Sequence, residues 1–360
     1  MEESDFIDQL TFEDLRERYQ SERDVRLRDT RSSFEGEEEG LRRDIGAGIE
    51  DDRRHREVLN LALNLFANAA SRPYQLGYRF VHGSPLLELG VPNFDFLVAN
   101  VEAEGPIAIL GEAKGSVSGP AGVVAQTRER KQVALDHIEH IKERYLRTDL
   151  DPRVEVVLSV PAIGAQRVIE AIEDTGGGII PWMMDTGENL VSLELPRSID
   201  GQLRSTMLHS DRALNQALEK VRSTDRGFDI FPQSPPFTKL RMLVIHAMKE
   251  GQRYWIDRDE LSRRLNTELF YLSDDEVSGL VDEMIEMGFE VGVLKDIDGR
   301  PALSMRWGSR PSMEDELQKA WTDHRCGYEL QKRSDGKIVE LQEEFVRERD
   351  KRPPLESFDD

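Results

Sequence analysis

Three charged residues that could act together, Asp95, Glu112 and Lys114, lie in two apolar segments that we expect to be buried strands. The segments, residues 91–99 and 106–114, contain β-branched and aromatic residues and are bounded by proline and glycine. Side chains two positions apart in a strand point to the same face, so Glu112 and Lys114 should project together. A hairpin between the segments would bring Asp95 close to both.

Two carboxylates and one ammonium group at the end of a buried hairpin are costly to desolvate unless they pair or hold an ion. Hard oxygen ligands with no cysteine nearby suit Mg²⁺ or Mn²⁺. Such a metal ion supports the attack of water on a phosphodiester. The alternative is a strand end that carries a surface ion pair and has no chemical role.

An Asp on one strand followed by Glu-Ala-Lys at the end of the next, here Asp95 and Glu112–Lys114, resembles the PD-(D/E)xK nuclease superfamily. That superfamily includes many restriction endonucleases and archaeal Holliday junction resolvases. Its signature proline usually abuts the Asp, whereas Pro92 lies three residues before Asp95. The resemblance implies that Asp95, Glu112 and the carbonyl of Ala113 bind Mg²⁺ or Mn²⁺. It also implies that Lys114 orients or helps to activate the attacking water.

Helices on either side of these strands carry further candidate site residues. Members of the superfamily often place a Glu on the helix before the strands, and Glu57 on the expected helix 51–70 could match it; a solvated helix face is the alternative. Some members carry a helical Gln after the Lys, and Gln126 on the expected helix 123–146 could match that position. The same helix begins with a basic cluster that we expect to contact nucleic acid: Arg128, Arg130 and Lys131.

The order of expected elements predicts an α/β protein with a restriction-endonuclease-like α-β-β-β-α-β core, a mixed sheet and a separate winged-helix α+β domain. The resemblance to the nuclease superfamily covers roughly residues 51–185. We expect five regions: a charged N-terminal arm at 1–50, a nuclease-like domain at 51–196, a linker with one helix at 197–236, a winged-helix-like domain at 237–308 and a polar helical tail at 309–360. Within the arm, the Glu- and Gly-rich residues 35–40 suggest a flexible joint.

Residues 237–308 predict the order helix, short strand, helix, helix and hairpin, which resembles a winged-helix domain. Such domains often read DNA through their third helix. Here that helix carries acidic residues that would repel phosphate: Asp274, Asp275, Glu276, Asp282, Glu283 and Glu286. We therefore favour a role in protein contact, dimerisation or weak DNA positioning over sequence recognition.

The net charge of −22 differs from the basic footprint usual in nucleic-acid-binding proteins. Arginine outnumbers lysine and acidic residues dominate, a composition that resembles that of halophilic, archaeal-type proteins. At molar salt the Debye length is only about 3 Å, so long-range repulsion from DNA would be largely screened. In a cell with molar salt, the large negative net charge therefore argues only weakly against DNA binding.

The composition also indicates in which cellular compartment the protein is expected. The single cysteine, Cys326, excludes a disulfide framework within the chain and a cysteine-based zinc site. The acidic amino terminus shows no signal peptide, and no apolar run approaches the ~20 residues that span a bilayer. We expect a cytoplasmic protein without a membrane partner.

These features predict a metal-dependent endodeoxyribonuclease that hydrolyses phosphodiester bonds with activated water. DNA is the expected partner, together with a homodimer or a protein bound through the winged-helix-like domain. Two alternatives stay open. One is a nuclease-fold protein that binds DNA without cutting, such as a regulatory or defence-system subunit, and the other is a scaffold whose strand-end charges are purely structural.

Overall fold

The computed structural model describes residues 12–102, 105–187, 190–192, 208–219, 221–222, 231–249, 255–304 and 310–350. The chain divides into two compact units. One is Ile49–Arg306, and the other combines Met1–Gly48 with Trp307–Asp360. None of the helices in these described segments is long and apolar enough to cross a membrane.

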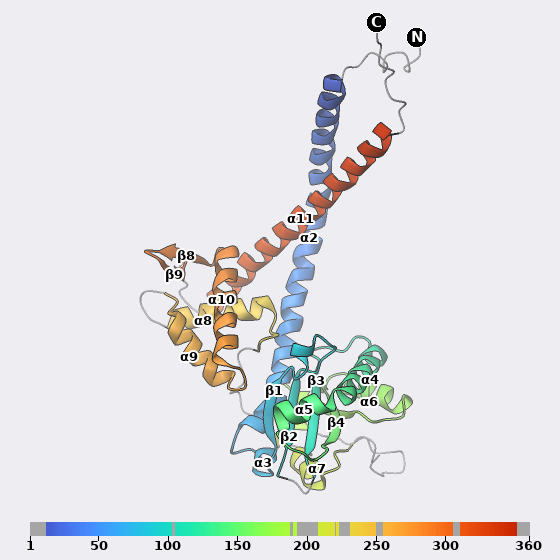
Figure 1. The fold of residues 1–360 in the computed structure, drawn as a ribbon, viewed down its shortest axis with the longest axis vertical. Helices are drawn as coiled ribbons and strands as arrows, with labels where there is room; N and C mark the ends of the chain where they lie inside the picture. Colours follow the sequence, from blue (N-terminus) through green and yellow to red (C-terminus); the bar gives the residue numbers. More distant parts are fainter. Residues whose placement is uncertain are drawn as a thin grey trace. The chain divides into compact units, whose positions relative to one another are not determined.

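The unit Ile49–Arg306 is built on a mixed sheet whose strands follow chain order from β1 to β7. Strands β1, β2, β3 and β4 of this sheet are labelled in Figure 1. The strands are β1 (Arg79–Gly83), β2 (Phe96–Asn100), β3 (Ile107–Ala113), β4 (Arg153–Pro161), β5 (Ile180–Asp185) and the short β6 (Leu190–Ser192) and β7 (Val221–Arg222). The strands from β1 to β3 are antiparallel, those from β3 to β5 are parallel, and β6 and β7 extend the sheet in antiparallel pairing. The predicted α/β class is therefore confirmed.

Helices cover both faces of this sheet because its central strands are apolar on each side. On one face the end of α2 (Phe12–Ala67) contributes Phe66, which stacks on Trp182 of β5 at 5.5 Å between ring centroids. On the other face α4 (Pro120–Asp136) and α6 (Ala165–Asp174) pack against alternate residues of β3 and β4, including Leu110 and Leu158. Burial on both faces fixes the register of β3 and hence the direction of each of its side chains.

Shorter elements complete this part of the unit. They are α3 (Arg72–Gln75), the 3₁₀ turn η1 (Leu87–Leu89), α5 (Ile138–Ile141), the π-turn η2 (Lys142–Leu146) and α7 (Arg212–Leu218). The side chain of Asp211 caps α7 by accepting from the backbone N–H of Ala213 and Leu214.

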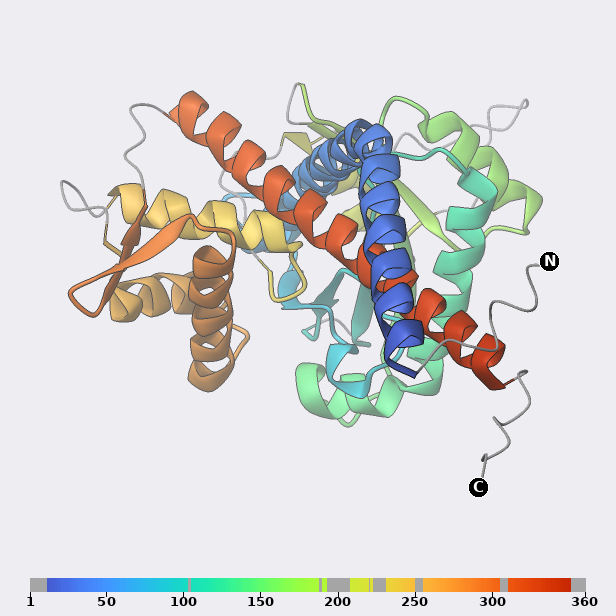
Figure 2. The ribbon, with the colours of Figure 1, turned by 90° about the horizontal axis from the view of Figure 1, so that it is seen from above.

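Residues beyond the sheet form a helical group with a hairpin, seen together in Figure 2. It contains α8 (Pro236–Lys249), α9 (Arg258–Glu268), α10 (Asp274–Glu290), β8 (Leu294–Ile297) and β9 (Arg300–Leu303). Ser273 and Glu276 form a capping box that begins α10. Asp298 and Gly299 both have positive φ, which suits the tight turn between β8 and β9. The predicted short strand at 253–256 lies partly outside the described residues, and its described part makes one bridge, from Trp255 to Ala302.

The second unit contains long helices. The flexible joint expected at residues 35–40 is wrong, because these residues lie within α2. Each glycine costs about 1 kcal/mol relative to alanine, but the flanking residues are good helix formers, and Arg42 pairs with Glu38 one turn earlier at 2.8 Å. The tail predicted to be helical contains the single helix α11 (Arg310–Asp350). Arg42 of α2 also pairs with Asp323 of α11.

Candidate active site

Asp95 is held at the carboxyl end of β3 by backbone contacts. Its N–H donates to the carbonyl of Gly111 at 2.9 Å, and its Oδ2 accepts from the N–H of Ala113 at 2.7 Å. The residue lies just before β2, not in the middle of a strand. Phe94 and Phe96 consequently pack into opposite hydrophobic cores.

Glu112 lies on the α4 face of β3 and is almost completely buried, with 1% of its surface exposed. Lys114 places its Nζ 2.6 Å from Oε1 of Glu112. Arg130, which reaches across from α4, pairs with Oε2 of the same carboxylate. Arg130 was predicted to contact nucleic acid, but its guanidinium forms one of the two ion pairs that Glu112 makes.

Asp95 is less well compensated than its neighbour. Burial, followed by the negative charge of Glu112, raises the pKa of Asp95 to about 6, although His55, Lys114 and the Ala113 N–H act in the opposite direction. The carboxylates of Asp95 and Glu112 therefore repel each other at one strand end, although Lys114 and Arg130 offset the charge of Glu112. A divalent cation is the kind of ligand that would relieve this repulsion.

Helix α2 reaches the site through a close backbone approach. A Cβ atom at Gly115 would lie only 2.2 Å from the backbone nitrogen of His55, so only glycine lets α2 pack against the end of β3. His55 then has its Nε2 4.0 Å from Oδ2 of Asp95. His55 was not predicted as a site residue, although it lies three and four residues before the buried Val58 and Leu59, on the same helix face.

Glu57 and Gln126 lie differently from what the superfamily resemblance suggested. Glu57 pairs with Arg53 at 2.5 Å and its side chain is 39% exposed. Two helical positions correspond to about 200°, so a helix that turns His55 toward Asp95 turns Glu57 away. Gln126 is exposed on α4.

The other two residues of the expected nucleic-acid cluster bind a loop of the same unit. Arg128 donates to the carbonyl of Gly177 at 2.5 Å, and Lys131 donates to that of Gly178 at 3.0 Å. Gly176, Gly177 and Gly178 all have positive φ. These two cations thus stabilise a left-handed glycine loop that few other sequences could form.

The donor set suits a hard divalent ion that keeps most of its water. Among the residues that the structure describes, no group of three or more His, Cys, Asp or Glu side chains is arranged to hold a metal. Mg²⁺ is often bound through only one or two carboxylates, with water or substrate oxygens completing the shell. Asp95 and Glu112, with the carbonyl of Ala113, fit that pattern, although cations already engage both oxygens of Glu112.

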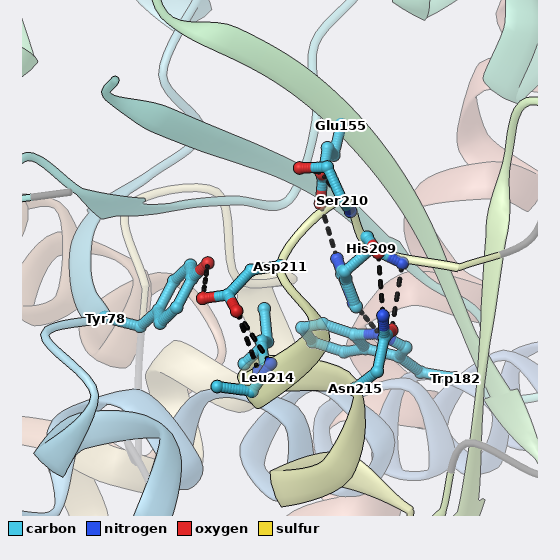
Figure 3. A network of polar contacts seen from close by, with 9 residues as sticks. Tyr78, Glu155, Trp182, His209, Ser210, Asp211, Leu214 and Asn215 are labelled. Atoms are coloured by element: carbon cyan, nitrogen blue, oxygen red, sulfur yellow. Dashed lines mark hydrogen bonds and ion pairs between the residues drawn. The ribbon is translucent and has the colours of Figure 1, made fainter. Parts of the chain in front are cut away.

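A second buried polar cluster lies elsewhere on the sheet and was not predicted (Figure 3). Glu155 of β4 accepts from Nδ1 of His209 at 2.6 Å and from the N–H and hydroxyl of Ser210. Trp182 donates its indole N–H to Nε2 of His209 at 3.0 Å, so the imidazole carries its proton on Nδ1. Both imidazole nitrogens and both carboxylate oxygens have partners. Tyr78 adds a hydrogen bond to Asp211 at 2.9 Å, and the cluster ties the segment before α7 to the sheet.

Comparison with known proteins supplies no relative. No protein-family model matches the sequence, no curated protein matches it, and no solved structure matches the fold. The function therefore has to be argued from the geometry of the site.

Proposed function

We propose that the protein is a metal-dependent endonuclease that hydrolyses phosphodiester bonds in DNA. The observation that carries the proposal is the convergence of Asp95, Glu112 and Lys114 at one strand end. Asp95 is bonded to the backbone between the other two residues, and Lys114 lies 2.6 Å from Glu112. Two carboxylates and one ammonium group in this arrangement are what a metal-assisted attack of water on phosphate requires.

The order of elements supports the same proposal. Helix α2, the antiparallel strands β1 to β3, helix α4 and the parallel strand β4 follow the α-β-β-β-α-β order of restriction-endonuclease-like proteins. The group from α8 to β9 has the helix and hairpin order of a winged-helix domain. A shared order of elements is an argument by analogy, so the site residues carry more weight.

Each residue has a role that its position allows. Asp95 and Glu112 would hold Mg²⁺ or Mn²⁺, which when bound supplies an activated water and stabilises charge on the phosphate oxygens. Lys114 is 26% exposed and can orient water while its positive charge offsets charge that develops on the phosphate. Arg130 pairs with the second carboxylate oxygen of Glu112 and offsets its negative charge. Glu57 and Gln126 are left out of this proposal because the one pairs with Arg53 and the other is exposed.

The proposal is tested by incubating the full-length protein with plasmid, single-stranded and branched DNA at high KCl, with Mg²⁺, Mn²⁺ or EDTA. We expect metal-dependent cleavage that Lys114→Ala reduces by about 10²–10³-fold. Lys319→Ala removes an exposed lysine from α11 and is the matched control. A folded wild type that cuts none of these substrates, or equal cutting by Lys114→Ala, would contradict the proposal.

A second candidate is a nuclease-fold protein that binds DNA without cutting it. The engagement of both Glu112 oxygens by Lys114 and Arg130 favours it, since a metal ion must compete with two cations already in place. Binding of DNA without cleavage, together with no Mn²⁺ binding that depends on Glu112, would support this second function.

A further inference from the structure

A cavity of about 640 Å³ opens in the unit Ile49–Arg306, beside the end of β1. Its walls come from β1, η1, η2 and the chain that leads into α10. The volume falls within the range of roughly 300–1,000 Å³ that is usual for small-molecule sites. Neither Glu112 nor Lys114 lines it.

One wall of the cavity is aromatic and apolar. The ring of His82 lies 4.6 Å from that of Tyr145 and 4.7 Å from that of Tyr271, measured between centroids. Burial lowers the pKa of His82 to about 4, so its imidazole is neutral near pH 7. Leu87 also lines the cavity, with 53% of its surface exposed. This wall suits a flat, largely uncharged ring.

Two arginines, Arg144 and Arg147, and two acids line the cavity. Glu88 pairs with His140 at 2.8 Å, and Glu276 accepts from Ser273 in the capping box and keeps a negative charge that attracts Arg144. Arg144 is 3.7 Å from Glu88 and 60% exposed. The guanidinium of Arg147 makes no hydrogen bond or ion pair with any residue that the structure describes. An anionic group would therefore find two accessible arginines here.

We propose that this cavity binds a nucleotide, with its base against the wall of His82, Tyr145 and Tyr271 and its phosphate on Arg144 and Arg147. The same chemistry is offered by a free mononucleotide and by the terminal nucleotide of a DNA strand. Neither a nucleoside nor a phosphate alone would use both halves of the cavity.

The cavity also touches the segment that holds Asp95. Ser84 lines the cavity, and its N–H donates to the carbonyl of Asp95 at 3.1 Å. The preceding Gly83 is paired in register with Phe96. A ligand that restricts the motion of Gly83 and Ser84 therefore also restricts the position of Asp95. This coupling to the site rests on the proposed function, whereas nucleotide binding in the cavity does not.

Binding is measured by calorimetry with 5′-AMP on the full-length protein without divalent metal. We expect saturable binding with one site per chain, at least tenfold weaker in Arg144→Gln/Arg147→Asn. Asn tolerates the positive φ of 51° at position 147, so the fold should persist, which thermal melting checks. Arg263→Gln removes an exposed arginine of α9 outside the cavity and should bind like wild type. Adenosine and inorganic phosphate should each bind more weakly than 5′-AMP.

Two further experiments ask whether the ligand is a free nucleotide or a DNA strand end, and whether its site is separate from the proposed cleavage site. Short oligodeoxyadenosines with and without a 5′-phosphate show whether a strand end competes with 5′-AMP, and no competition assigns the cavity to a free nucleotide. Glu112→Gln should bind 5′-AMP normally, which separates this site from the proposed cleavage. If 5′-AMP fails to bind the folded wild type, or binds the double variant equally well, the nucleotide site is overturned. The coupling is tested by adding 5′-AMP to the plasmid cleavage assay. If 5′-AMP binds but leaves the rate of DNA cleavage unchanged, the nucleotide site stands and only its coupling to Asp95 is contradicted.

Discussion

Two buried glutamates of neighbouring strands have opposite electrostatic surroundings. Glu155 of β4 accepts hydrogen bonds from His209 and Ser210, and these outweigh its burial and lower its pKa. Glu112 of β3 is held by two long cationic side chains and lies beside Asp95, whose pKa is raised. The first cluster is complete within the chain. The second retains charge that an added cation could satisfy.

The contrast teaches that burial of a carboxylate does not by itself mark a functional site. Hydrogen bonds from the backbone and from a neutral imidazole fix Glu155 in one geometry, as a structural tie requires. Lys114 and Arg130 hold Glu112 through side chains alone, and a cation that binds Glu112 has to displace or share at least one of them. The difference lies in the partners, and each partner can be removed separately.

The largest expected effect is on DNA cleavage and distinguishes the Glu112 cluster from the Glu155 cluster. Asp95→Asn and Glu112→Gln should each reduce DNA cleavage by at least about a thousandfold, equivalent to ~4 kcal/mol of transition-state stabilisation, because each removes a carboxylate proposed to hold the metal. His209→Gln should leave the rate of the remaining folded protein within about threefold. Rates are measured on plasmid DNA with Mg²⁺ after folding is checked by circular dichroism. Equal losses in both clusters would remove the distinction.

The next effect is on stability and should be confined to the Glu155 cluster. Glu155→Ala leaves His209 and Ser210 with buried donors and no acceptor, and should lower the free energy of unfolding by about 3–5 kcal/mol. Glu155→Gln should also destabilise the protein. Its amide NH₂ must face either the Ser210 donors or an imidazole whose other nitrogen is committed to Trp182. Urea unfolding of both variants measures the loss, and a wild-type midpoint would show that the cluster is dispensable.

Asp95→Asn should raise the free energy of unfolding where the Glu155 variants lower it, and the size of this gain should depend on pH. The folded protein holds the Asp95 proton more tightly than the unfolded chain does, since the pKa rises from 3.8 to about 6. Rising pH between these values therefore removes stability. The variant should be more stable than wild type above pH 6, by about 3 kcal/mol at most, and equal to it below about pH 4.

The pH effect is followed by thermal melting from pH 4 to pH 8. Addition of Mg²⁺ above pH 6 should stabilise the wild type but not Asp95→Asn, because a bound cation takes over the role of the proton. A variant less stable than wild type at pH 8 would show that Asp95 is well compensated after all.

The smallest effect tests the contact between α2 and the strand end. Gly115→Ala introduces a Cβ against the backbone of Arg54 and His55, and should cost about 1–3 kcal/mol through overpacking. Cleavage should fall as well, since His55 and Asp95 would move apart. Gly122→Ala is the control, because a Cβ there meets nothing within 4 Å. Unchanged melting of Gly115→Ala would mean that the helix shifts without cost.

Local pattern was enough to predict much of the sheet and the approach of Asp95, Glu112 and Lys114 to one another. Strand β3 lies inside the predicted apolar segment 106–114, β2 runs one residue past the segment 91–99, and the two-residue period placed Glu112 on a defined face. The last turns of α2 followed from the spacing of its apolar residues. These signals are local, so they do not depend on the rest of the fold.

What escaped prediction depends on contacts between distant residues. Glu155 and His209 are 54 positions apart, and no spacing near either residue indicates a partner. His55 has a visible helical position, but only the packing of Gly115 against α2 brings it toward Asp95. The cationic partners of Glu112 likewise depend on how α4 crosses β3. The continuous α2 was missed because two glycines were weighted above their helix-forming neighbours.

The buried Trp182 gives the protein a built-in optical reporter. It is one of four tryptophans, is fully buried, and packs against both Phe66 and Phe96. Its indole N–H is bonded to His209. Emission from a dry, hydrogen-bonded indole differs in colour and lifetime from that of a solvated one. Time-resolved fluorescence can therefore follow the interior of the sheet while metal or nucleotide is titrated, without any label.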